Sequence, residues 1–376
     1  MTSRTLITHF SLRSRIQSIQ VRPRVFGPLL AIAAIFSLPA EASEAQPLFE
    51  NSWTIEATIK APIGRIMQNR SEDEELEGTF TYKTLAGEQQ ELAVKVRIRG
   101  HFRADKKVCD FAPLRLNFKK KQVAGTEFAG QDKIKMVTHC QNKIRTYEQL
   151  MLKEYLTYRI LSAVTENAFR VRLLRINYID SEGKSSSRTH YAFLIEHRKK
   201  LAARVGLEPG NAEAIMFSQL DDAQTNLVTV YSYLIGNTDF SAVLGPKKDR
   251  CCHNVELFKN SNNQYVPIPY DFDFSGMVDA PYAVPNPRFN IKKVTDRRYR
   301  GLCKNNNLLE SSFALFDEHH AEITAMIGNF EPLNKVSRNQ MKRYVERFYK
   351  ETGNDGKVEK YFVKECSNAT GPPKVS

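Results

Sequence analysis

Residues 266–276 read Val-Pro-Ile-Pro-Tyr-Asp-Phe-Asp-Phe-Ser-Gly, an apolar segment that ends in two carboxylates. The apolar start predicts a short buried strand. Residues two apart in an extended chain point the same way, so we expect Asp271 and Asp273 to face one cleft. Two such acids repel each other unless a cation lies between them, and Mg²⁺ is usual where a phosphate supplies the other oxygens. A strand end that turns through an acidic loop explains the same residues without any function.

A second stretch, residues 231–241, reads Tyr-Ser-Tyr-Leu-Ile-Gly-Asn-Thr-Asp-Phe-Ser. We expect an apolar helix to end at Gly236, with Asp239 shortly after it. Asn254 then opens a strand ahead of Asp271. An Asp, then an Asn, then a later Asp is the order of a protein-kinase-like catalytic loop.

Together these motifs resemble the CotH-type atypical kinases, known from spore coat proteins and distantly similar to HipA-like and lipid-kinase folds. The resemblance spans roughly residues 90–280, about half the chain, and is greatest to an uncharacterised bacterial branch. The order of the pieces is more specific than any one of them. The pieces are Arg97-Ile-Arg-Gly-His101, Pro113-Leu-Arg-Leu-Asn-Phe118, Ala192-Phe-Leu-Ile-Glu196, Gly236-Asn-Thr-Asp239, His253-Asn254 and Pro269-Tyr-Asp-Phe-Asp273.

The resemblance implies an α+β, two-lobed, protein-kinase-like fold. An antiparallel, β-rich N-lobe would occupy residues 46–203, and a mainly helical C-lobe residues 204–366, before a flexible tail over 367–376. The implied activity is transfer of phosphate from ATP to the hydroxyl of an unknown protein or small molecule, with Mg²⁺ or Mn²⁺ as cofactor.

The resemblance also assigns roles to four residues. Asp239 would orient or deprotonate the acceptor hydroxyl. Asn254 and Asp271 would hold the metal, and Asp273 would be a second ligand or a structural cap. No Gly-x-Gly-x-x-Gly phosphate loop occurs in the chain, which departs from protein kinases.

A kinase needs a cation on its small lobe for the α- and β-phosphates, usually held by a helix acid. Arg115 and Lys135 are the chosen cations, although Arg99 and Lys119 are also available. Glu154, on a helix expected over residues 146–165, is the chosen acid beside Glu148. Glu196 ends a strand where, by resemblance, the backbone would meet an adenine edge. Surface lysines, helix glutamates and strand-end acids are also common without any function.

Two other functions fit the same residues. The first is a pseudokinase that serves as a binding or assembly module, which the missing glycine loop and the insert between Asp239 and Asn254 favour slightly. The second is an unrelated hydrolase whose paired aspartates bind a divalent metal.

Alternation of apolar and polar residues predicts β-structure between residues 50 and 130. Expected strands cover residues 54–60, 78–83, 91–99 and 114–118. Short strands at 133–139, 169–179 and 189–197 flank the long helix, and further helices are expected from Asp221, over 305–329 and over 335–351.

Residues 1–45 read as a signal peptide or an uncleaved N-terminal anchor. Five arginines precede an apolar run over residues 25–38, which is short for a membrane span, and small residues follow it. We therefore expect an exported protein, periplasmic or secreted, that is either free or anchored by residues 25–38. No other window is apolar enough to cross a membrane.

Six cysteines in an exported chain predict disulfides. We expect Cys109 to pair with Cys140, because both flank predicted strands. Cys251 and Cys252 are expected to pair with different distant partners, and the absence of Cys-x-x-Cys argues against a zinc site.

The formal net charge is +13, which suits anionic partners such as nucleotides or an acidic acceptor. The excess is spread along the chain and no dedicated nucleic-acid motif is present. A basic stretch over residues 292–300 is either a solvated surface or a place to hold an acidic acceptor.

Overall fold

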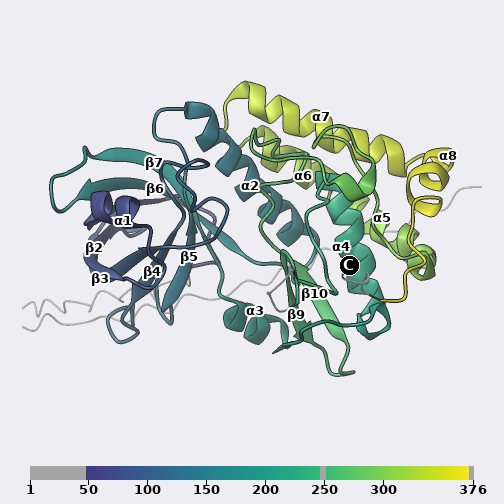
Figure 1. Cartoon of the computed structure of the whole chain (residues 1–376), viewed down its shortest axis with the longest axis horizontal. Helices are drawn as coiled ribbons and strands as arrows, with labels where there is room; N and C mark the ends of the chain where they lie inside the picture. Colours follow the sequence, from purple (N-terminus) through teal and green to yellow (C-terminus); the bar gives the residue numbers. More distant parts are fainter. Residues whose placement is uncertain (1–47, 246–250, 372–376) are drawn as a thin grey trace, which may run out of the picture. The chain divides into compact units, whose positions relative to one another are not determined.

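The computed structural model describes residues 48–245 and 251–371 (Figure 1). The predicted signal peptide or anchor, with its apolar run at 25–38, lies outside the described residues. So do the last five residues of the predicted tail.

A closed barrel of seven strands forms the first part of the described chain, in the order β1-β2-β3-β4-β5-β7-β6. Neighbouring strands are antiparallel except β1 and β6, which run parallel and close the barrel. The strands are β1 (Ile55–Ala61), β2 (Leu76–Lys83), β3 (Gln89–Ile98), β4 (Leu114–Phe118), β5 (Lys133–Val137), β6 (Val171–Asp180) and β7 (Arg188–Ile195).

The barrel interior follows from the alternation in the sequence. In β3 the side chains of Val94, Val96 and Ile98 are buried, while the residues between them face outward. Aromatic side chains fill the centre, where the rings of Phe80 and Phe118 meet edge to face at 5.6 Å. Apolar burial of this kind contributes about 25 cal/mol per Å².

The predicted two-lobed, protein-kinase-like fold is wrong. The first part of the chain is a closed, mixed barrel rather than an antiparallel lobe, and the described residues form one compact unit rather than two separate lobes. The reason is the parallel pairing of Ile55 with Leu174 and of its neighbours along β1 and β6. Alternation in a sequence shows which face of a strand is buried, but not which distant strand lies at its edge.

Helix α2 (Arg145–Val164) connects the barrel to the helices (Figure 1). It contacts β6 and β7 of the barrel and also α6 and α7. Eleven of its side chains are buried, including those of Lys153 and Glu154. The other α-helices are α1 (Ile63–Asn69), α3 (Arg198–Val205), α4 (Asp222–Ile235), α5 (Leu309–Glu318), α6 (His320–Gly328), α7 (Lys335–Thr352) and α8 (Asp355–Val358).

Helix α4 and a small sheet support the motifs found in the sequence. Asp221 caps α4 by accepting a hydrogen bond from the backbone of Gln224, and Gly236 ends the helix in the left-handed conformation. The sheet has the order β10-β9-β8, all antiparallel. Its strands are β8 (Glu208–Pro209), β9 (Val255–Lys259) and β10 (Tyr265–Pro269).

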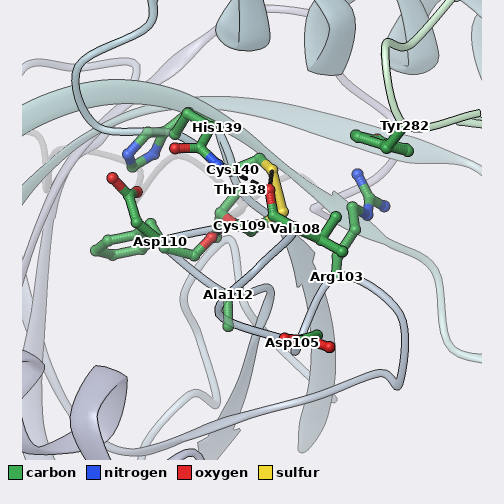
Figure 2. Close-up of a disulfide and its surroundings, with 12 residues drawn as sticks. Arg103, Asp105, Val108, Cys109, Asp110, Ala112, Thr138, His139, Cys140 and Tyr282 are labelled. Atoms are coloured by element: carbon green, nitrogen blue, oxygen red, sulfur yellow. Dashed lines mark hydrogen bonds between the residues drawn. A yellow bond between two sulfur atoms is a disulfide. The ribbon is translucent and has the colours of Figure 1, made fainter.

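The six cysteines form three disulfides. Cys109 pairs with Cys140, which confirms the prediction (Figure 2), and Cys303 pairs with Cys366 near the end of the chain. Cys251 and Cys252 pair with each other, so the expectation that they pair with distant partners is wrong. The other four cysteines pair with one another, so Cys251 and Cys252 have no distant cysteine with which to pair.

Disulfides are compatible with an exported protein, because they persist in oxidising compartments. Within residues 48–245 and 251–371, none of the helices combines the length and the apolar character that crossing a bilayer requires.

The Cys109–Cys140 disulfide closes a loop of 31 residues. Replacing both cysteines by alanine should lower the free energy of unfolding by about 3–4 kcal/mol in the chain-entropy model. Cys140 has a φ of 66°, but cysteine and alanine both carry a Cβ, so the backbone cost of that conformation cancels. Urea unfolding followed by circular dichroism measures the difference.

The matched control replaces Cys303 and Cys366, which are 63 residues apart. The longer loop should cost slightly more when it is opened. An unchanged unfolding midpoint in the Cys109/Cys140 double variant would contradict the prediction.

Candidate functional site

Two glycines hold the two sequence motifs against each other. The backbone N–H of Gly276 donates to the carbonyl of Gly236 at 3.0 Å, and that of Met277 donates to Ile235 at 2.9 Å. The hydroxyl of Tyr344 packs on both glycines, so a Cβ at either position would clash with it. The loop after α4 and the loop after β10 are thus joined backbone to backbone.

Asp239 is fixed by hydrogen bonds to its backbone and to both carboxylate oxygens. Its N–H donates to Asn237 Oδ1 at 2.9 Å. His253 Nε2 lies 2.9 Å from Asp239 Oδ1, and Asn254 Nδ2 donates to Asp239 Oδ2 at 3.0 Å. The side chain is still 33% exposed, so it can meet a second molecule.

The Asp239 hydrogen bond raises the pKa of His253 above its ordinary value, although burial opposes it. A protonated His253 would donate to Asp239 and fix the orientation of that carboxylate. The pair is therefore an oriented acid on a half-exposed surface, as general-base or acceptor-orienting chemistry requires.

Arg300 clamps the loop that carries Asp239. Its guanidinium donates to the carbonyl oxygens of Thr238 and Phe240, the residues on either side of Asp239. It also stacks over the Phe240 ring with 4.3 Å between the guanidinium carbon and the ring centroid. Burial lowers the pKa of Arg300 to about 10, and the negative charge of Asp239 opposes that shift.

Asn254 and Asp271 lie beside each other at one end of the β9–β10 hairpin. The N–H of Tyr270 donates to the carbonyl of Asn254 at 3.0 Å, continuing the pairing of Pro269 with Val255. Both residues have positive φ angles, 52° for Asn254 and 61° for Asp271. Left-handed backbone at two adjacent non-glycine positions is uncommon and concentrates at functional sites.

A buried tyrosine holds the backbone of Asp271 in this conformation. The hydroxyl oxygen of Tyr158, on α2, accepts a hydrogen bond from the Asp271 N–H at 2.7 Å. The Asp271 side chain remains 39% exposed. Its carboxylate is therefore accessible to solvent at the end of the hairpin where Asn254 lies.

Arg103 lies among three acids. Its nitrogens are 3.0 Å from Glu154, 3.6 Å from Asp271 and 3.3 Å from Asp273. Tyr282 also donates to Asp273 Oδ2 at 3.0 Å. Burial raises the pKa of Asp273 and that of Glu154 above their ordinary values, although the Arg103 charge opposes both shifts.

Lys135 and Arg115 are cross-strand neighbours on β5 and β4. The ammonium of Lys135 lies 4.9 Å from the ring centroid of Tyr270, the residue before Asp271. Burial lowers the pKa of Lys135 to about 8, and the positive charges of Arg99 and Arg115 contribute. Arg115 Nε is buried without a hydrogen-bond partner among the described residues. These cations thus lie close together and beside the acids.

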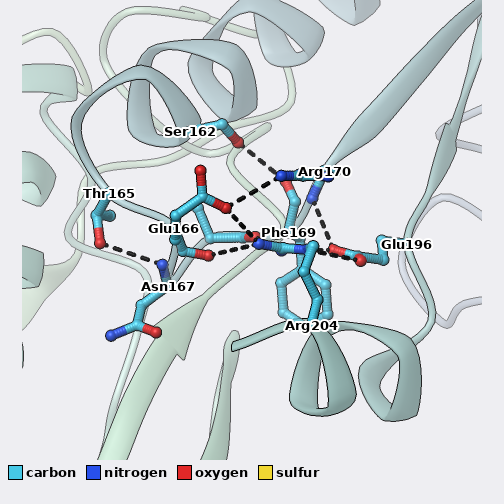
Figure 3. Close-up of polar contacts among 9 residues, drawn as sticks. Ser162, Thr165, Glu166, Asn167, Phe169, Arg170, Glu196 and Arg204 are labelled. Carbon is cyan, nitrogen blue, oxygen red and sulfur yellow. Dashed lines mark hydrogen bonds and ion pairs between the residues drawn. The ribbon is translucent and has the colours of Figure 1, made fainter. Parts of the chain in front are cut away.

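Glu196 is occupied by an ion pair (Figure 3). Arg204 donates to both of its carboxylate oxygens, at 3.1 and 2.8 Å, and the backbone of Arg170 donates at 3.2 Å. The preceding residue, Ile195, pairs with both Lys135 and Val171 in the barrel. These contacts explain the presence of an acid here without a nucleotide.

The basic stretch at 292–300 is largely used within the protein. Arg297 pairs with Glu351, Arg298 pairs with Glu365, and Arg300 binds the carbonyls beside Asp239. Only Lys292 and Lys293 of this stretch have side chains without such a partner among the described residues. The stretch is therefore mostly a set of internal clamps.

The donors around Asp271 fit a divalent metal that is delivered together with a phosphate. No group of three or more His, Cys, Asp or Glu within the described ranges is arranged to hold a metal by itself. Asp271 and Asn254 nevertheless offer a carboxylate and an amide oxygen from the same end of the hairpin, and Mg²⁺ commonly takes one or two protein oxygens plus substrate phosphates. Asp273 fits less well, because Arg103 and Tyr282 already occupy its Oδ2.

The structure thus places four of the predicted residues in one region: Asp239, Asn254, Asp271 and Asp273. Glu154 is linked to them by its ion pair with Arg103. Lys135 and Arg115 lie nearby. Sequence reasoning missed Arg103, Arg300 and Tyr158, and it gave no role to His253. Arg103 lies two residues after the Arg97–His101 piece of the resemblance, which was its only signal. Arg300 belonged to the basic stretch at 292–300, but nothing in that stretch indicated that it would hold the Asp239 loop. Tyr158 gave no signal, because its role depends on contact with a distant segment.

Comparison of the chain with models of known protein families gives no match, and comparison with curated proteins gives none either.

The low pKa of Lys135 leads to a test by pH. Unfolding returns this amine to an ordinary lysine pKa, near 10.4, so between about pH 8 and that value the unfolded chain binds more protons. Parent stability should therefore rise with pH across this window relative to Lys135→Met, by at most about 1.4 kcal/mol per pH unit. Urea unfolding of both proteins at a series of pH values measures the difference.

Below about pH 8 the difference between the two proteins should be constant. Lys133→Met is the matched control, since Lys133 is an exposed lysine on the same strand. Parallel stability curves for parent and Lys135→Met from pH 8 to 10 would show that Lys135 is an ordinary lysine.

Proposed function

We propose that this protein is a phosphotransferase that moves a phosphoryl group from ATP to the hydroxyl of a protein or small molecule, as its resemblance to the CotH-type atypical kinases implies. One observation carries the proposal: Asp239, Asn254 and Asp271 converge on one half-exposed surface. Two loops joined at Gly236 and Gly276 position them, with lysine and arginine side chains beside them.

Asp239 would receive the acceptor hydroxyl. His253 and Asn254 hold its two oxygens, and Arg300 fixes the backbone on both sides. An acid held so firmly can orient a hydroxyl and accept its proton as the oxygen attacks the phosphorus atom. Reactions of this kind depend mainly on positioning and electrostatics, which such a rigid loop supplies.

Asn254 and Asp271 would hold Mg²⁺ or Mn²⁺ through the amide oxygen and the carboxylate. When bound, the metal would neutralise charge on the phosphate oxygens. Both residues have left-handed backbone, and the Tyr158 hydroxyl and the hairpin pairing hold them in place.

Lys135 and Arg115 would contact the phosphate oxygens of the nucleotide. An anion here would relieve the repulsion among Arg99, Arg115 and Lys135. Charge-assisted hydrogen bonds of this kind are the strong ones in proteins. This set of cations replaces the glycine-rich loop that the sequence lacks.

We propose that the enzyme acts outside the cytoplasm. The disulfides and the order of basic, apolar and small residues at the N-terminus support export. A net charge of +13 favours an acidic acceptor through long-range attraction.

A binding module without catalysis is the second candidate, and the contacts of Arg103 favour it. One guanidinium already forms ion pairs with Asp271, Asp273 and Glu154 and offsets part of their negative charge. A metal is therefore less necessary for charge balance than the two aspartates alone would suggest. The two candidates differ in turnover rather than in nucleotide binding.

Asp271→Asn tests the metal role. The change keeps the shape of the side chain but removes a charge, so Mg²⁺-dependent nucleotide binding should fall by at least about tenfold, equivalent to about 1.4 kcal/mol. Thermal shift with ATP, with and without Mg²⁺ or Mn²⁺, measures binding, because a ligand that binds only the folded state raises its melting temperature.

Asp180→Asn is the matched control, since its carboxylate binds backbone N–H groups at the far end of β6. It should change stability and leave nucleotide binding alone. If Asp271→Asn binds Mg²⁺-nucleotide as tightly as the parent, the metal role is wrong. If the parent binds no nucleotide under any metal, the phosphotransferase proposal fails and a metal-dependent hydrolase gains weight.

Asp239→Asn separates the enzyme from the binding module. An acceptor-orienting acid acts mainly as the acceptor loses its proton, so its loss should lower turnover by about 10²–10⁴-fold and leave nucleotide affinity nearly unchanged. Transfer of labelled phosphate, or ATP hydrolysis where no acceptor is present, measures turnover.

Glu196→Gln serves as the control here, because its carboxylate binds Arg204 rather than the converging acids. It should lose stability with little loss of turnover per folded molecule. Equal trace turnover in parent and Asp239→Asn, with nucleotide bound by both, would favour the binding module.

A further inference from the structure

Arg103 is buried and directs each of its three nitrogens at a different carboxylate. Its side chain is only 9% exposed. Nη1 lies 3.0 Å from Glu154 Oε2, Nη2 lies 3.6 Å from Asp271 Oδ1, and Nε lies 3.3 Å from Asp273 Oδ2. Planar guanidinium groups suit such multiple pairing, whereas an ammonium is a single point charge.

The three acids outnumber the one cation. Glu154 and Asp273 are almost fully buried, with side chains 1% and 7% exposed. Carboxylates buried close together repel one another, and removing the partner of a buried charge is strongly destabilising. Tyr282 supplies one more donor to Asp273. Arg103 is therefore the cation that makes this arrangement of acids possible.

The loop that carries Arg103 is fixed by hydrogen bonds and by a disulfide. Arg70 Nη1 donates to the carbonyl of Ala104 at 2.7 Å, and Asp105 accepts hydrogen bonds from the turn that follows. Six residues after Arg103 the disulfide from Cys109 to Cys140 fixes the loop to the residues after β5. Figure 2 shows the Arg103 side chain directed away from this disulfide, toward Tyr282. The guanidinium is a built part of the site.

We propose that Arg103 is the resident counter-cation of the site: it positions Asp271 and Asp273 and occupies the place that a second divalent cation would otherwise take. The inference rests on the proposed phosphotransferase function for its meaning, because many phosphotransferases bind two metal ions around the transferred group. With Arg103 in place, the site takes a single divalent cation, which arrives with the nucleotide.

The test counts bound metal ions instead of measuring activity. In Arg103→Met the three carboxylates lose their cation, so the variant should bind Mn²⁺ alone at least about tenfold more tightly than the parent, equivalent to about 1.4 kcal/mol. Electron paramagnetic resonance of free Mn²⁺ during a titration measures this without nucleotide. With a non-hydrolysable ATP analogue, the parent should bind one Mn²⁺.

A second variant guards against misfolding. Arg103→Met combined with Glu154→Gln restores the formal local charge of the parent and removes the most buried acid. It should still gain Mn²⁺ binding through Asp271 and Asp273. Arg103→Lys keeps a positive charge and should not gain it.

Arg297→Met is the matched control for losing a buried arginine. Arg297 is 3% exposed and pairs with Glu351 at 3.1 Å, outside the three-acid group. It should lose stability and bind Mn²⁺ no better than the parent.

The proposal is overturned if Arg103→Met or the double variant is folded and binds Mn²⁺ no more tightly than the parent. Two Mn²⁺ ions bound by the parent with the ATP analogue also overturn it. If the variants gain Mn²⁺ binding although the parent binds no nucleotide, the counter-cation role of Arg103 is supported. The proposed phosphotransferase function is refuted in that case, while the counter-cation role stands.

Discussion

The ion pairs of Arg103 are the interaction on which the site depends, because they join three separate parts of the chain. Arg103 belongs to the loop after β3 of the barrel, Glu154 to α2, and Asp271 and Asp273 to the loop after β10. Buried charges are stable only when they are paired and hydrogen-bonded. Any movement of the barrel loop relative to α2 would therefore leave a charge without a partner. Such a buried network fixes the position of the loop more than it adds to net stability.

A second constraint acts on the backbone. Gly236 and Gly276 touch under Tyr344, and this contact sets the spacing of the loops that carry Asp239 and Asp271. Gly236 directly follows α4 and begins the Gly236–Asp239 piece, and Gly276 ends the 266–276 stretch after β10. Their lack of a side chain is thus a requirement of close approach rather than of flexibility. The acids are placed by the backbone and then fixed by Arg300, Tyr158 and Asn254.

The elements were predictable from the sequence because they depend on local patterns. The alternation of Val94, Val96 and Ile98 indicated β3, and the Asp221 cap and Gly236 located both ends of α4. The closure of the barrel was not predictable, since β1 pairs in parallel with a strand more than a hundred residues later. In the site, the order of the local motifs indicated Asp239, Asn254 and Asp271 as one group. Arg103 and Arg300 were not indicated, because they act through contacts with segments that are distant in the sequence.

The site contains a group of cations next to a group of acids, and this arrangement determines which ligand charges it would favour. Lys135, Arg115 and Arg99 repel one another enough to contribute to the low pKa of Lys135, while the nearby acids are balanced by a single guanidinium. At 4 Å and an effective dielectric constant of 20, two unit charges interact by about 4 kcal/mol, several times a typical net hydrogen bond. A phosphate group next to the cations would convert that repulsion into attraction, and a divalent cation next to Asp271 would do the same for the acids. The ligand of the proposed function, a metal-bound polyphosphate, would carry both together and would match both halves of the site better than a phosphate or a metal ion alone.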